Sequence, residues 1–142
     1  MRTLLFLCTG NYYRSRFAEY VFNARAASRG MEWRAVSRGL AVERGAVSEG
    51  PVSELVLHRL RELGISVDAS RHPHPAAADD FSRAQRVIAL KEAEHRPLVH
   101  ERHPRWADLV EYWHVHDDDP NSAYDPLAEI ESAVGALIVE LS

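Results

Sequence analysis

A short motif close to the N-terminus of this 142-residue chain limits the folds that it can adopt. The apolar run Leu4–Leu7 is followed at once by Cys8, then by five residues and Arg14, where a helical pattern begins. Five residues between a strand and a helix can curl into a cup whose backbone N–H groups point at one anion. The positive end of the helix adds to the attraction at the same point. The segment therefore predicts an α/β chain with an anion-binding loop after its first strand.

The composition is typical of one ordinary globular domain. Hydrophobic residues make up 46% of the chain and charged residues 27%, and no apolar run approaches the ~20 residues of a membrane helix. A formal net charge of −4 argues against a general nucleic-acid binder. The first residues are not expected to form a secretory signal. We therefore expect a single domain over 1–142, a cytoplasmic location, no nucleic-acid or membrane partner, and a monomer or weak homodimer.

Strand and helix patterns alternate along the chain. Strands are expected at 2–7, 33–37, 86–90 and 109–115, and loops at 41–51 and 72–78. Helices are expected at 15–28, from Ser53 to Leu63, after residue 90 until a break at Pro97 or Pro104, and from Pro126 to Leu141. This alternation predicts a single doubly wound four-stranded parallel sheet with helices on both faces. Ligands of such sheets bind beyond the carboxyl ends of the strands, where Cys8 and the residues after Val115 would meet.

The motif resembles that of the low-molecular-weight protein tyrosine phosphatases. The family pattern, a first strand running into Cys-x5-Arg-Ser with Gly and Asn inside the loop, is matched by Cys8, Gly10, Asn11, Arg14 and Ser15. The resemblance continues over 36–39, 63–65, 70–71 and 87–90, and so spans nearly the whole chain. It implies a metal-independent phosphomonoester hydrolase without a cofactor. Its substrate would be a phosphorylated protein, above all a phosphotyrosine protein, or a small aryl phosphate.

The resemblance also implies a role for each residue of the loop. Cys8 would be the nucleophile and form a phosphocysteine, and Arg14 would hold two phosphate oxygens in its planar fork. Ser15 would donate a hydrogen bond to the sulfur, and Asn11 would brace the loop from behind in a left-handed conformation. The phosphate-binding residues would be Thr9, Gly10, Asn11, Tyr12, Tyr13, Arg14 and Ser15. Apart from the resemblance, the negative net charge is compatible with a local basic cup at Arg14 and Arg16.

The general acid of the family is an aspartate after the last strand, usually followed by proline. Spacing from Trp113 selects Asp117, whereas the requirement for a following proline selects Asp119, and both remain open. Asp118 is expected to face solvent. Asp125 precedes Pro126 and is expected to cap the last helix.

Other classes of function leave weaker marks in the sequence. A non-catalytic phosphate-binding module would not need the nucleophile. Arsenate-reductase chemistry needs further cysteines, whereas Cys8 is the only one and Tyr13 stands where many family members carry a second. The pattern His114-x-His116-x-Asp118 superficially resembles a motif of binuclear metallohydrolases, but Asp119 replaces its final histidine. No metal site is expected.

Overall fold

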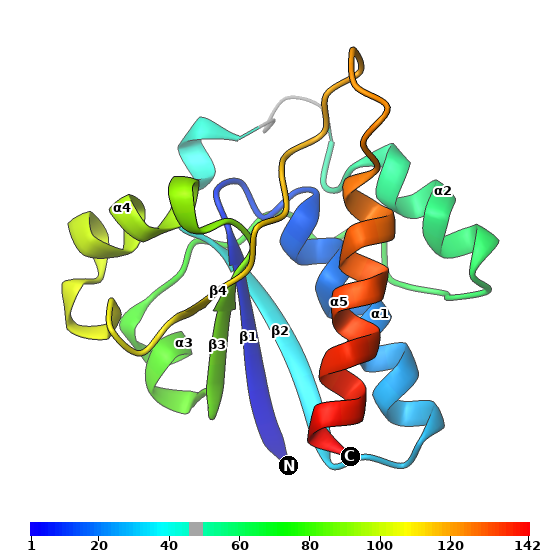
Figure 1. Cartoon of the computed structure of the whole chain (residues 1–142), viewed down its shortest axis with the longest axis horizontal. Helices are drawn as coiled ribbons and strands as arrows, with labels where there is room; N and C mark the ends of the chain where they lie inside the picture. The colour runs from blue at the N-terminus through cyan, green and yellow to red at the C-terminus, as the bar shows by residue number, and fades with distance from the viewer. Residues whose placement is uncertain (46–49) are drawn as a thin grey trace.

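A four-stranded sheet forms the centre of the computed structural model, which describes residues 1–45 and 50–142 (Figure 1). Its strands are β1 (Arg2–Cys8), β2 (Trp33–Gly39), β3 (Arg86–Ala89) and β4 (Glu111–Tyr112). All neighbours are parallel and the order is β2-β1-β3-β4, so β1 lies inside the sheet. The predicted parallel sheet is confirmed, although β4 is shorter than the predicted 109–115.

Helices cover both faces of the sheet, as predicted. On one face, Leu4 and Phe6 of β1 pack with residues of α1 (Arg14–Ser28), α2 (Glu54–Glu62) and α5 (Pro126–Leu141). On the other, Leu5 and Leu7 pack with residues of α3 (Ala78–Arg83) and α4 (Glu92–Arg102). Successive side chains of a strand point to opposite faces, so a continuous apolar run is what a strand buried on both sides requires.

Local signals account for the starts of α2 and α5 and for the end of α4. The Ser53 side chain accepts from Leu55 N, and the Asp125 side chain accepts from Leu127 N and Ala128 N, so both predicted caps are confirmed. Helix α4 continues through Pro97 and ends at Arg102, before a turn of 3-10 helix over Pro104–Trp106. The break therefore falls at the second proline.

Two more short elements, like the turn over Pro104–Trp106, have no predicted counterpart. Helix α3 follows the loop predicted at 72–78; Phe81 is its single buried residue, so it shows no apolar period. The loop predicted at 41–51 contains a 3-10 turn over Val42–Arg44, and its residues 46–49 lie outside the described part of the chain. None of the described helices is long and apolar enough to cross a membrane.

Candidate active site

The loop between β1 and α1 surrounds the sulfur of Cys8 with hydrogen-bond donors. Cys8 is the last residue of β1 and is only 3% exposed. Its Sγ lies 3.0 Å from Ser15 Oγ and accepts the backbone N–H of Asn11 at 3.3 Å. A sulfur that accepts an N–H and lies beside a hydroxyl able to donate is placed to carry negative charge.

Asn11 supports this loop from behind. Its φ of 53° is the only positive φ of a non-glycine residue in the described chain. The buried side chain donates to Ser15 Oγ at 2.9 Å and to Ser37 Oγ at 3.0 Å, and its Oδ1 accepts His74 N at 3.0 Å. Asparagine tolerates the left-handed region better than most residues, and these three bonds hold it there.

Glycines let the backbone of a second loop lie directly against the first. A Cβ on Gly10 would meet Gly45 Cα at 3.1 Å, and a Cβ on Gly45 would meet Gly10 Cα at 2.8 Å. The turn over Val42–Arg44 therefore leads into a wall of the site, and Arg44 borders the cleft beside it.

Arg14 is fixed by groups from two distant parts of the chain. It is 2% exposed, and its guanidinium donates to Val115 O at 3.0 Å and to Glu94 Oε2 at 2.6 Å. Burial opposes its charge, but the contacts with Glu94 and Cys8 outweigh burial and raise the pKa of Arg14. Sequence reasoning missed Glu94, because a carboxylate in the charged first turn of α4 carries no signal of its partner.

Glu94 is itself held in its ionised form. Its carboxylate also accepts the hydroxyl of Thr9 and lies 3.1 Å from His95 Nε2. Burial would raise the pKa of Glu94, but contacts with His95, Arg14 and Thr9 hold that pKa well below its usual range. Burial lowers the pKa of His95, and its Nδ1 accepts Lys91 N at 2.9 Å, so the ring proton is on Nε2.

The acidic segment after β4 brings two of its three aspartates to the site. Asp117 and Asp118 line the cleft, and Asp117 Oδ2 lies 3.8 Å from an Arg14 nitrogen. Asp119 is absent from the described lining, and its side chain accepts Asn121 N at 2.9 Å. Asp118 is exposed, as expected, even though it borders the cleft.

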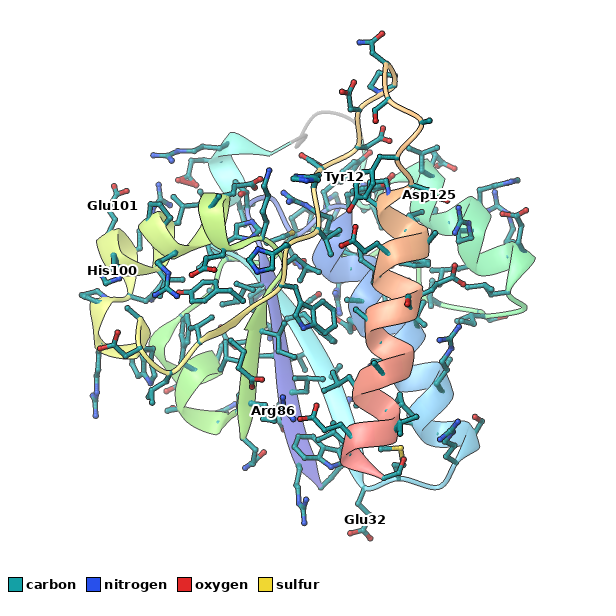
Figure 2. The ribbon with its side chains drawn as sticks, in the orientation of Figure 1. Tyr12, Glu32, Arg86, His100, Glu101 and Asp125 are labelled. Atoms are coloured by element: carbon teal, nitrogen blue, oxygen red, sulfur yellow. The ribbon has the colours of Figure 1, made fainter. Side chains whose placement is uncertain are left out.

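The cleft over the loop has a volume of about 720 Å³. Tyr12 and Tyr13 both line it; Tyr13 also packs against the core, and Figure 2 shows Tyr12 at the same end of the molecule as Asp125. The other described residues of the lining are Cys8, Thr9, Gly10, Arg14, Arg44, Gly45, Ser53, Glu54, Leu55, Glu94, Asp117 and Asp118.

Arg16 does not join Arg14 in a local basic cup. It is 0% exposed and lies outside the described lining of the cleft. Two residues along a helix turn the side chain by about 200°, so Arg14 and Arg16 leave α1 on different sides.

Within the described ranges, no three His, Cys, Asp or Glu side chains are grouped so that they could hold a metal ion.

Several solved structures are similar to this chain over nearly its whole length. A low molecular weight protein tyrosine phosphatase from T. tengcongensis is 26% identical, with a TM-score of 0.75, over 99% of this chain and 97% of its own. Wzb from Vibrio vulnificus, solved with benzylphosphonate, is 16% identical, with a TM-score of 0.82, over 99% of each chain. The YwlE arginine phosphatase from Geobacillus stearothermophilus is 21% identical, with a TM-score of 0.72, over 99% of this chain and 93% of its own. No curated protein matches in sequence.

The family comparison covers nearly the whole chain. The model of the family described as low molecular weight phosphotyrosine protein phosphatase matches residues 3–140. This range includes the loop around Cys8, the acidic segment and both packed faces of the sheet. The protein is thus a cysteine-based phosphatase and belongs to the low molecular weight phosphotyrosine protein phosphatase family.

Proposed function

We propose that Cys8 is the nucleophile of a two-step phosphomonoester hydrolysis. Its sulfur would attack phosphorus, so that an S–P bond forms as the ester P–O bond breaks. Water would then break the S–P bond and release phosphate. The placement of Cys8 Sγ against Asn11 N–H and Ser15 Oγ, beside Arg14, carries this proposal. Covalent catalysis of this kind divides one difficult step into two easier ones.

Arg14 would bind the phosphate, together with the backbone N–H groups of the loop over residues 9–15. Val115 O and Glu94 each accept one bond from its terminal nitrogens, and no described residue accepts from its Nε–H. A guanidinium held in this way can offer a planar pair of donors to two phosphate oxygens. Lysine would offer only a point charge.

Asp117 would act as the general acid. It lines the cleft and lies close to Arg14, whereas Asp119 is engaged with Asn121 N. Its proton would pass to the leaving oxygen in the first step, and its carboxylate would accept a proton from water in the second.

Phosphotyrosine in a protein is the substrate that we propose. The family suggests it, and a cleft of about 720 Å³ lined by Tyr12 and Tyr13 has room and aromatic surface for a phenyl ring. One structural relative is an arginine phosphatase, so phosphoarginine is the alternative to exclude. A small aryl phosphate would enter the same cleft. The use of a lone cysteine as a free thiol suits a reducing compartment, which supports a cytoplasmic location.

Substitutions of Cys8 and the aspartates test the proposal. Cys8→Ser should abolish turnover of nitrophenyl phosphate without loss of the fold. Asp117→Asn should lower kcat roughly 10²- to 10⁴-fold on phenyl phosphate and less on nitrophenyl phosphate, whose leaving group needs no proton. Asp119→Asn is the matched control and should retain activity on both.

The outcome also identifies the acid and the substrate. If Asp119→Asn alone shows the leaving-group dependence, Asp117 is not the acid. If Cys8→Ser retains more than a few per cent of activity, the covalent mechanism is wrong. Matched phosphotyrosine and phosphoarginine peptides should differ in kcat/KM in favour of phosphotyrosine, and the reverse order would replace the proposed substrate.

A further inference from the structure

We propose that Arg16 is a positioning residue that orients one peptide group of the phosphate-binding loop. The proposal rests on the function proposed above and adds a residue that does not touch the substrate. Arg16 would act through the peptide group between Asn11 and Tyr12.

Arg16 is fully enclosed behind the loop and fastens three separate segments. Its guanidinium donates to Asn11 O at 3.3 Å, to Pro51 O at 3.1 Å and to Arg71 O at 2.7 Å. Two further N–H groups donate to Tyr20 OH at 3.1 and 2.8 Å. Burying a charge is costly unless its hydrogen bonds are satisfied. Arg16 is 0% exposed, and this set of acceptors offsets the cost of its burial behind the loop.

The bond to Asn11 O fixes a direction inside the loop. The chain contains no cis peptide bond among its described residues, and in a trans peptide the C=O and the next N–H point in opposite directions. Because Asn11 O points at the buried Arg16, the N–H of Tyr12 points away from it, toward the cleft that Tyr12 lines. Arg16 thereby holds one loop amide in the orientation that an anion needs.

The same side chain also holds the segment that hydrogen-bonds to the backbone of Tyr12. Tyr12 O accepts the backbone N–H of Ser53 at 3.1 Å. The Arg16 guanidinium donates to the carbonyl oxygen of Pro51, which lies two residues before Ser53. Ser53, Glu54 and Leu55 line the cleft. Loss of Arg16 should therefore free both the peptide group and the segment that flanks it.

Three variants test the role. Arg16→Met removes the donors and the charge while it keeps much of the volume. Arg16→Lys keeps the charge but cannot reach three carbonyls at once. Asn23→Ala is the control for stability: it lies on α1 away from the loop and loses a pair of bonds to the Ala35 backbone.

Two measurements separate positioning from stability. The first is the inhibition constant of inorganic phosphate against nitrophenyl phosphate, at a temperature where each variant is folded. The second is the ratio of alkylation rates of Cys8 by iodoacetate and by neutral iodoacetamide, which reports anion binding without turnover. Cys8 is the only cysteine, so the label is unambiguous.

We expect Arg16→Met to weaken phosphate binding roughly tenfold, as for one misdirected hydrogen bond to a charged group, and to lower the alkylation ratio. Arg16→Lys should show most of this loss, and Asn23→Ala should lose thermal stability only. If Arg16→Met does not fold, Arg16→Lys decides. Wild-type phosphate affinity in Arg16→Lys would overturn the proposal, because charge alone would then suffice. Failure of the wild type to bind phosphate would instead refute the proposed function.

Discussion

Replacement of Asn11 by alanine should destabilise the whole domain, because this side chain joins the loop to its support. The change removes bonds to Ser15 Oγ, Ser37 Oγ and His74 N. At about 1 kcal/mol net for each bond, and about 1 kcal/mol more for alanine at a φ of 53°, the loss is about 4 kcal/mol. Domains of this kind are stable by roughly 5–15 kcal/mol, so the variant should fold but melt early. For this chain of 142 residues the expected fall in Tm is roughly 10 °C.

Urea unfolding and thermal melting of wild type, Asn11→Ala and Asn11→Gly would test this value. Glycine loses the same hydrogen bonds but carries no left-handed penalty, so Asn11→Gly should be more stable than Asn11→Ala, by about 1 kcal/mol. Both variants should also bind inorganic phosphate more weakly, because the Asn11 N–H faces Cys8 Sγ.

A loss below about 1 kcal/mol in Asn11→Ala would refute the reasoning, since it would mean that the three bonds contribute nothing net. Equal stabilities of the alanine and glycine variants would refute the backbone part alone. Unchanged phosphate affinity in a destabilised variant would show that Asn11 stabilises the domain without setting the geometry of the loop.

Three further perturbations have defined outcomes. The pKa of Glu94 is held low in the folded state, so its contribution to stability is present above the unfolded pKa of about 4.3 and is lost as pH falls below it. In urea unfolding at pH 7, 5, 4 and 3, the free energy of unfolding should therefore fall less steeply with pH in Glu94→Gln than in wild type. Parallel curves for the two proteins would contradict this. Arg14→Lys should lower kcat/KM on nitrophenyl phosphate roughly 10²-fold, because a point charge replaces the fork, and near-normal kinetics would exclude bidentate binding. Excess EDTA should leave the rate unchanged while vanadate inhibits; activity lost to EDTA and restored by zinc would reinstate a metal mechanism.

Contiguous sequence determined the fold class and the loop. The alternating strands and helices, the strand that ends at Cys8 and the caps at Ser53 and Asp125 are all present as predicted. Each depends on interactions within a few residues or on an apolar period, and both are visible in the sequence. Helix α3 was missed because a helix of six residues with one buried side chain shows no apolar period.

The packing of distant elements sets which charged groups surround the loop. Glu94 reaches Arg14 across 80 residues because β3 pairs with β1 and places the start of α4 beside the loop. Asp117, not Asp119, lies near Arg14, although both follow the same strand. Arg14 and Arg16 are both buried, but only Arg14 belongs to the described lining of the cleft. These outcomes depend on which elements pack together, and a carboxylate or guanidinium in the sequence does not show its partner until the sheet order and helix faces are set.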